Sequence, residues 1–217
     1  MLLELNQLIV PPGHQLLIKN VSWQMYKHIL SELGENRSSR VSYSQEMLEI
    51  MAPLPEHEVG KKIIGNLVEI LLEELDIEFW SLGSTTFDKE EMKSGVEPDD
   101  CFYIKNEAAV RGKDRIDLAV DPPPDLAIEI DITSRTRFNN YEALGVDELW
   151  RWNGSKLEIN VLFDGKYVEF NTSRIFPNLP IAQVIPKYLM QSKTDGRNAT
   201  MKAFRAWIAT SITNPAL

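Results

Sequence analysis

The sequence predicts a mixed α/β fold in which helices flank a central mixed sheet. A long run from Pro55 to Leu75 carries apolar residues at helical spacing, whereas Leu126 to Ile132 alternates as a half-buried strand does. Asn153-Gly154 and Asp164-Gly165 are tight-turn signals that predict a C-terminal β-meander. With 43% hydrophobic and 25% charged residues, the 217-residue chain is typical of one well-packed globular domain.

The N-terminal part of the chain predicts one helix and one hairpin. Residues Met1 to Pro12 are an apolar lead that we expect to form a strand or an interface arm, ended by a Pro-Pro-Gly break. Ser22 is a good N-cap for an amphipathic helix that ends at Gly34. Arg40–Tyr43 and Met47–Met51 then form the predicted hairpin, joined by a Ser44-Gln45 turn.

The helix expected from Pro55 to Leu75 begins with charged residues. Its predicted buried stripe consists of Val59, Ile63, Leu67, Ile70, Leu71 and Leu75. His57 and Glu58 lie in the first turn, where the exposed amides favour an anion, and Lys61 follows one turn later. The simpler interpretation of Glu58 is that it only complements the helix dipole.

The middle of the chain contains short strands and loops. Residues 77–82 and 85–87 predict two strands, and 88–93 predict a solvated loop. Between residues 104 and 121 four basic residues collect, which predicts either a phosphate-facing loop or a solvated turn; they are Lys105, Arg111, Lys113 and Arg115.

The C-terminal part predicts a short helix, a meander and two further helices. The short helix ends at Gly145. The strands of the meander are expected at 148–152, 156–163 and 167–170. Helices are predicted at 181–190 and 201–212, separated by a polar loop at 191–200.

Two strand-like runs carry acidic residues where a half-buried strand should be apolar. In the run after Pro124, the apolar residues share one face, and the other face carries Glu129 and Asp131 and is expected to be acidic throughout. Same-face carboxylates repel each other, so they must face water or bind a cation. Such oxygen donors suit magnesium, manganese or calcium, and the chain has no cysteine and histidine cluster for zinc.

Composition narrows the possible functions further. The formal charge of -9 argues against a broad basic surface for non-specific nucleic-acid binding. Cys101 is the single cysteine, which fits a reducing compartment, and no signal peptide or long apolar span is expected, so we predict a cytoplasmic protein. A glycine-rich nucleotide loop and a G-x-S-x-G motif are both absent from the sequence.

The order and spacing of several motifs resemble the Uma-two family within the PD-(D/E)xK nuclease superfamily. The similar segments are Met51–Glu58, Pro98-Asp99, Pro124–Ile130 and Tyr141–Trp150. They extend from about Ser42 to Pro180 in the chain. The resemblance implies a restriction-endonuclease-like core at 41–180 within a single domain spanning 1–217, with an N-terminal extension at 1–40 and a C-terminal helical tail at 181–217.

The resemblance implies a DNA endonuclease that depends on Mg²⁺ or Mn²⁺ and hydrolyses phosphodiester bonds. Asp99 and Glu129 take the two acidic positions as metal ligands, and the resemblance favours a site role for His57 and, less strongly, for Glu58 as a ligand. The superfamily's lysine, two residues after the glutamate, is Asp131 here. Asp131 is either a further ligand or a solvent-facing strand residue.

In the superfamily the lysine supplies a positively charged group near the carboxylates. Because Asp131 occupies its position here, another residue must supply this charge, and Lys61 and Arg137 are the candidates. A second function class stays open, in which the nuclease fold persists as a non-catalytic DNA-binding or dimeric interaction protein. We also expect a homodimer, because the apolar N-terminus and the meander offer surface to bury.

Overall fold

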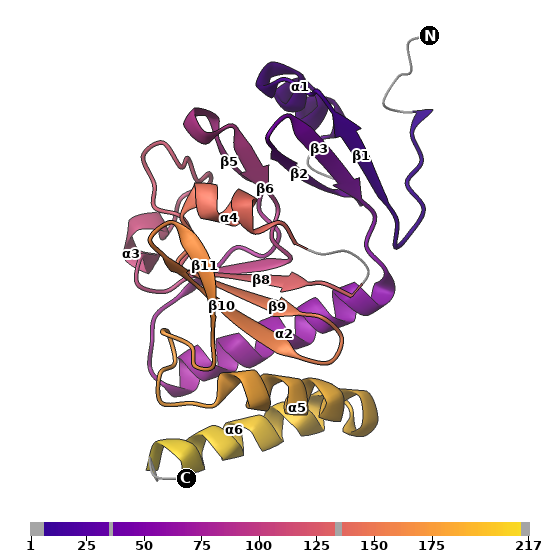
Figure 1. Cartoon of the computed structure of the whole chain (residues 1–217). Helices are drawn as coiled ribbons and strands as arrows, with labels where there is room; N and C mark the ends of the chain where they lie inside the picture. The colour runs from indigo at the N-terminus through magenta and orange to yellow at the C-terminus, as the bar shows by residue number, and fades with distance from the viewer. Residues whose placement is uncertain (1–6, 35–36, 133–135, 214–217) are drawn as a thin grey trace.

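The computed structural model describes residues 7–34, 37–132 and 136–213, and it contains two sheets (Figure 1). The larger sheet has six strands in the order β11-β10-β9-β8-β7-β4. Its strands are β4 (Trp80–Ser81), β7 (Asp100–Tyr103), β8 (Leu126–Ile130), β9 (Glu148–Trp152), β10 (Leu157–Phe163) and β11 (Lys166–Phe170). Because β8 and β9 are parallel and the other pairs antiparallel, the predicted mixed sheet and C-terminal meander are confirmed.

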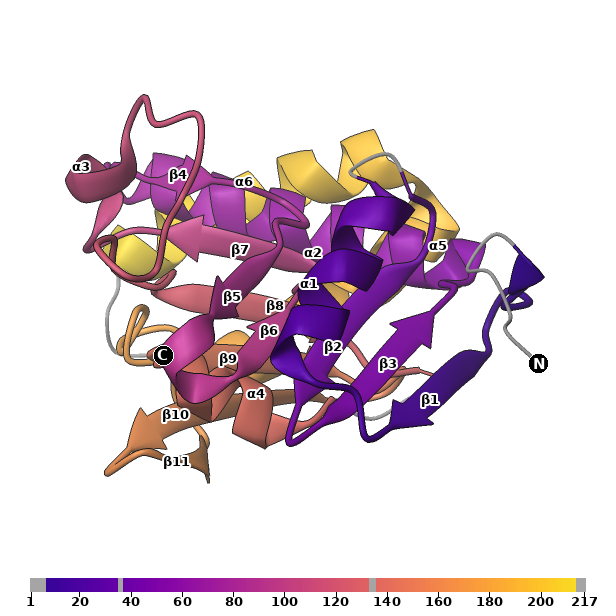
Figure 2. The same cartoon turned by 90° about the horizontal axis from the view of Figure 1, so that it is seen from above.

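The smaller, antiparallel sheet has the order β1-β3-β2-β6-β5 and lies on the N-terminal side of the molecule (Figure 2). Its strands are β1 (Gln15–Lys19), β2 (Arg40–Ser44), β3 (Met47–Met51), β5 (Phe87–Lys89) and β6 (Ser94–Val96). Helix α1 (Trp23–Leu33) covers it, beginning where the Ser22 hydroxyl accepts a hydrogen bond from the Met25 amide. The helix and hairpin predicted from sequence are both confirmed.

Three details of this N-terminal part differ from the sequence prediction. Residues 7–12 form no strand, and β1 follows the Pro-Pro-Gly break instead of preceding it; Met1 to Asn6 lie outside the described residues. Strand β1 was missed because its burial alternates only weakly along the sheet edge. The hairpin turn consists of Gln45 and Glu46, both at positive φ, which is one residue later than predicted and matches the twist of a two-residue hairpin.

Three helices lie on one side of the six-stranded sheet, two against its strands and the third against those two helices. They are α2 (Pro55–Glu74), α5 (Ile181–Asp195) and α6 (Arg197–Thr213), which form successive layers below the sheet in Figure 1. The apolar core between them includes Leu67, Leu71 and Phe204. Val59 is wrongly predicted as part of the buried stripe, since 51% of it is exposed at the start of α2. None of the described helices is long and apolar enough to cross a membrane.

A second apolar cluster covers the opposite face of the sheet. Helix α4 (Phe138–Leu144) packs there, and Ala127 of β8 is fully buried in this cluster together with Tyr141. The expectation that this face of β8 carries only carboxylates is therefore wrong, because the sheet is packed on both faces. Glu129 consequently lies at the margin of an apolar cluster, between the two sheets.

Short elements in the loops also depart from the predictions. The expected strands at 77–82 and 85–87 are shorter or shifted, as β4 and β5 show. The segment expected as a loop at 88–93 belongs partly to β5 and partly to the 3-10 helix η2 (Glu90–Met92), and the basic segment contains the short helix α3 (Glu107–Val110). The polar loop predicted at 191–200 is mostly helical, because α5 continues to Asp195 and the break is Gly196, at φ 80°.

Candidate active site

Asp99 and Glu129 lie next to each other between the two sheets. Strand β7 pairs with β8 as far as Asp100 opposite Ile128, so Asp99 follows one position beyond the last pair, beside Glu129. The Oδ2 atom of Asp99 accepts a hydrogen bond of 2.6 Å from the Ile130 amide, which fixes the Pro98-Asp99 step against β8. Asp99 is 1% exposed. The structure thus brings together the two acids that the sequence singled out.

Glu129 is held in an environment that disfavours its charge. Burial raises the pKa of its carboxyl well above the usual value, and the neighbouring carboxylates of Asp99 and Asp131 raise it further. The Tyr141 hydroxyl, from α4, donates a hydrogen bond to Glu129 Oε1 and opposes this shift. Tyr141 was not among the site residues expected from the sequence, because nothing in the sequence shows that α4 crosses the end of β8.

Asp131 is bound by Arg151 of β9. The Arg151 guanidinium contacts Asp131 Oδ2 through Nε at 2.7 Å and Nη2 at 2.6 Å, while Oδ1 accepts hydrogen bonds from the backbone and hydroxyl of Thr136. The Asp131 side chain is only 5% exposed, so the alternative of a solvent-facing strand residue is wrong. The position of the superfamily's lysine is therefore occupied by one half of a buried ion pair.

Arg40 is the basic residue that contacts Asp99, and sequence analysis did not identify it. It comes from β2 of the smaller sheet, and its Nη1 forms an ion pair with Asp99 Oδ1. Its Nη2 atom donates to Glu58 Oε1 at 3.2 Å, so Glu58 also belongs to this group of charges. No local sequence signal could have placed Arg40 here, since the contact depends on how the two sheets pack.

Lys61 is linked to Asp99 by hydrogen bonds through the Ser84 hydroxyl. Its Nζ atom donates a 2.5 Å hydrogen bond to the Ser84 hydroxyl, which in turn donates to the backbone carbonyl of Asp99 at 3.2 Å. Burial, and then the charge of Arg40, lower the pKa of Lys61. Of the two cations predicted from sequence, Lys61 is therefore the one beside Asp99.

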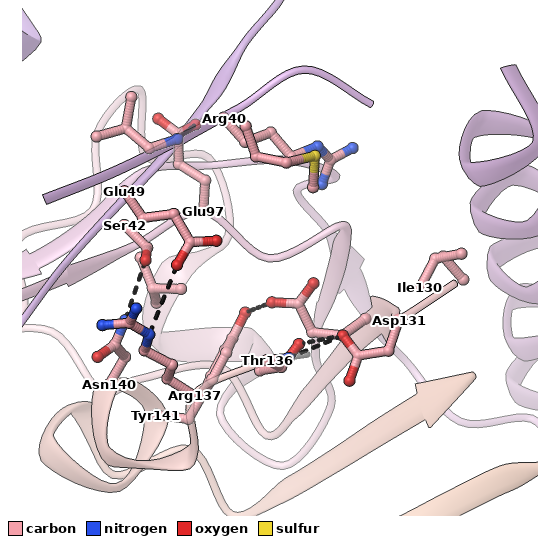
Figure 3. A pocket seen from close by; sticks show the side chains of 14 residues that line it. Arg40, Ser42, Glu49, Glu97, Ile130, Asp131, Thr136, Arg137, Asn140 and Tyr141 are labelled. Atoms are coloured by element: carbon pink, nitrogen blue, oxygen red, sulfur yellow. Dashed lines mark hydrogen bonds and ion pairs between the residues drawn. The ribbon is translucent and has the colours of Figure 1, made fainter. Parts of the chain in front are cut away.

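His57 and Arg137 occupy different places from the carboxylate pair. His57 is fully buried at the start of α2, and the described linings of the two pockets do not include it. Arg137 precedes α4 and forms an ion pair with Glu49 of β3 at 3.6 Å (Figure 3). Arg137 and Glu129 nevertheless line the same small pocket.

Two concave regions meet at this group of residues. The small pocket of Figure 3 lies between the β2–β3 hairpin and α4 and is lined by Glu129, Asp131 and Arg137 among others. A larger open cleft lies on the other side, between α1, the start of α2 and residues 113–117. Arg40 and Glu97 line both regions, so the small pocket and the cleft meet at these two side chains.

Part of the predicted basic loop faces the larger cleft. Lys113 and Arg115 line it together with Lys61, although they are some fifty residues apart in sequence. Lys113 also forms an ion pair with Asp121. Arg111 pairs with Glu107, and Lys105 is exposed outside the described lining. Six basic and five acidic residues line the cleft, in a chain whose total charge is -9.

A divalent cation fits the chemistry of Asp99 and Glu129. Asp99 Oδ1 is buried and already lies against the Arg40 guanidinium, so the site holds one cation, and the charge of Asp99 disfavours ionisation of Glu129. Among the described residues no group of three His, Cys, Asp or Glu side chains is arranged to hold an ion. Magnesium is commonly held by one or two carboxylates together with water and substrate phosphate, so two are sufficient.

The neighbouring Asp100 gives a prediction about pH. Its carboxyl packs against α2 at Gly65, where an added Cβ would lie 2.4 Å from Oδ2, and burial raises its pKa to about 6. Because the folded pKa exceeds the unfolded value, this group destabilises the fold progressively as pH rises from 4 to 6, and fully above 6.

We expect Asp100→Asn to raise the free energy of unfolding by roughly 1 to 3 kcal/mol at pH 8 and by almost nothing at pH 3.5. Urea titrations of both proteins in EDTA at the two pH values measure this difference. If the wild type and Asp100→Asn were equally stable at pH 8, the raised pKa of Asp100 would be contradicted.

Comparisons with known proteins show the fold and the family of this chain. A crystal structure from Anabaena variabilis, described as a "putative nuclease belonging to DUF820", has a similar fold, with a TM-score of 0.53 and 11% identity, covering 78% of this chain and 99% of that chain. The chain thus shares the fold of that protein.

The particular family follows from the sequence. The Uma2 family, described as "Putative restriction endonuclease", matches residues 23–189, and the chain belongs to this family. The resemblance inferred from the motifs is therefore confirmed. No curated protein matches the sequence.

Proposed function

We propose that the protein is a DNA endonuclease that depends on Mg²⁺ or Mn²⁺ and hydrolyses phosphodiester bonds. The observation that carries this proposal is the position of Asp99, directly before β7, beside Glu129 of the adjacent strand β8; Asp99 is buried and Glu129 is partly buried. An ion held there would supply an activated water and neutralise charge on the attacked phosphate. The family match and the nuclease fold support the same reaction class.

The surrounding residues take separate roles in this proposal. Asp99 and Glu129 hold the ion, and Tyr141 orients the Glu129 carboxyl. Asp131 and Glu58 already bind Arg151 and Arg40, so they would join the ligand set only by exchanging those partners.

The basic residues considered for the site have different positions and therefore different proposed roles. Lys61, whose lowered pKa favours the neutral amine more than in an ordinary lysine, is placed to exchange a proton near Asp99. Arg137 stabilises the small pocket through Glu49, and His57 supports the start of α2 from the interior.

DNA is proposed to lie along the larger cleft. Lys61, Lys113 and Arg115 come from two distant segments and line it together, which gives phosphate groups several cationic neighbours. Most of the chain's excess acid lies outside this lining, so the negative total charge is compatible with a local DNA path. We place this activity in a single cytoplasmic domain spanning 1–217.

The test is incubation of purified protein with supercoiled plasmid in Mg²⁺, in Mn²⁺ and in EDTA. Nicked or linear plasmid should form with either metal and not with EDTA. If no DNA offered is cut in either metal, the proposed activity is wrong, and the alternative of a non-catalytic DNA-binding or dimeric nuclease fold replaces it. The Asp131–Arg151 ion pair at the superfamily's lysine position is the observation that favours this alternative.

We further propose a homodimer formed through the free edge of β11. This strand ends the six-stranded sheet, and Phe163, Val168 and Phe170 near it are 56%, 46% and 39% exposed. Light scattering at micromolar concentration should give twice the mass of the chain, and Val168→Lys should give a monomer. A monomeric wild-type protein would contradict the proposal.

A further inference from the structure

Arg40 has an environment unlike that of the other basic residues near the carboxylates. Its guanidinium pairs with Asp99, donates to Glu58 and interacts favourably with the charge of Glu129, and its side chain is only 13% exposed. By contrast, Lys61 binds a serine hydroxyl and Arg137 binds Glu49. Among the described ion pairs, that of Asp99 is made with Arg40.

The position of Arg40 places it between the two concave regions. It lines the small pocket beside Glu129 and also the larger cleft beside Lys61. The group therefore reaches the carboxylates from the side on which the cleft opens. A guanidinium also presents a planar set of donors that matches a phosphate, and it remains charged at any physiological pH.

A metal ion and Arg40 would compete for the same carboxylate atom. Asp99 Oδ1 is paired with the Arg40 guanidinium, while Oδ2 accepts a hydrogen bond from the Ile130 amide. An ion that binds Asp99 must therefore take the atom against which Arg40 now lies. Arg40 keeps a second anchor in Glu58, at the edge of the cleft.

We propose that Arg40 supplies the positive charge that Asp131 cannot supply at the superfamily's lysine position. Arg40 neutralises Asp99 before an ion binds, yields Oδ1 to the ion, and then contacts the DNA phosphate in the cleft. This role rests on the proposed nuclease function. Arg40, a residue of the smaller sheet, would then supply the positive charge that the motif lysine supplies elsewhere in the superfamily.

The test measures metal binding and DNA cleavage separately. Mn²⁺ affinity is determined by calorimetry without DNA for the wild type, Arg40→Gln, Arg40→Lys and Lys113→Gln. Arg40→Gln removes the competing cation and should bind Mn²⁺ at least threefold more tightly, whereas its rate of plasmid cleavage should fall about 100-fold or more. Arg40→Lys should bind Mn²⁺ like the wild type and recover part of the cleavage rate.

Lys113→Gln is the matched control, because it removes a cation from the same cleft without touching Asp99. Its Mn²⁺ affinity should equal that of the wild type. Circular dichroism with and without Mn²⁺ verifies folding, and Arg40→Lys keeps the test valid if the glutamine variant does not fold.

The outcomes distinguish this inference from the proposed function. If the wild type cuts DNA and Arg40→Gln cuts it equally fast, or binds Mn²⁺ no more tightly, the role of Arg40 is wrong and the nuclease function stands. If the wild type cuts no DNA although Arg40→Gln binds Mn²⁺ more tightly, the nuclease function is wrong and the exchange between Arg40 and the ion is supported.

Discussion

Glu129→Ala is expected to abolish metal-dependent DNA cleavage while the protein stays folded. Loss of one of two carboxylate ligands removes several kcal/mol of transition-state stabilisation, which corresponds to a rate decrease of about 1000-fold or more. The fold should tolerate the change, because burial and the neighbouring Asp99 and Asp131 carboxylates already disfavour a charge at this position. Single-turnover cleavage rates and thermal melts of both proteins measure the two effects.

Glu169→Ala serves as the control for this experiment. Glu169 also lies on a strand of the larger sheet, but its side chain is half exposed and pairs with Lys156, and it lies outside the described lining of both pockets. This variant should cleave at the wild-type rate. If Glu129→Ala cleaves as fast as Glu169→Ala, Glu129 does not hold the catalytic ion.

Arg151→Met is expected to produce the largest loss of stability. The Arg151 side chain is 4% exposed and binds Asp131 through two nitrogens. It also lies 3.3 Å from Glu158 and packs over the Phe138 ring, 4.7 Å from the ring centroid. Methionine keeps much of the packing volume but leaves the Asp131 carboxylate buried without its cation. Removal of one partner of a buried ion pair costs about 3 to 5 kcal/mol.

Urea unfolding measures this loss, and a second variant separates charge from packing. Arg151→Met combined with Asp131→Asn removes both charges, so most of the lost stability should return. A loss below about 1 kcal/mol in the single variant would show that the pair is solvated and contributes as little as an exposed ion pair does.

The elements that the sequence predicted well are those with a strong local signal. Helix α2 has a long apolar stripe and a proline at its start, and the β10–β11 turn has the Asp164-Gly165 pair at positive φ. The end of α5 was misplaced because residues 191–195 are mostly polar and exposed, so no apolar periodicity marks them as helical. In the structure only Gly196 interrupts the two helices.

The candidate site was predictable only in part for a similar reason. Asp99 and Glu129 could be identified because each interrupts a strand-like run, and the order of motifs supported them. Arg40 and Tyr141 belong to elements that approach these acids from other layers of the fold. A contact between β2 and the start of β7 depends on how two sheets pack, and a single sequence carries no local signal for such packing.

The most direct test of the metal-dependent site is a crystal structure of the protein grown with Mn²⁺, with the ion located by its anomalous scattering. We predict one ion between the carboxyl groups of Asp99 and Glu129, at about 2.0 to 2.6 Å from an oxygen of each, with Arg40 no longer paired with Asp99. An ion bound elsewhere, or carboxyl groups more than about 8 Å apart, would contradict a shared metal site.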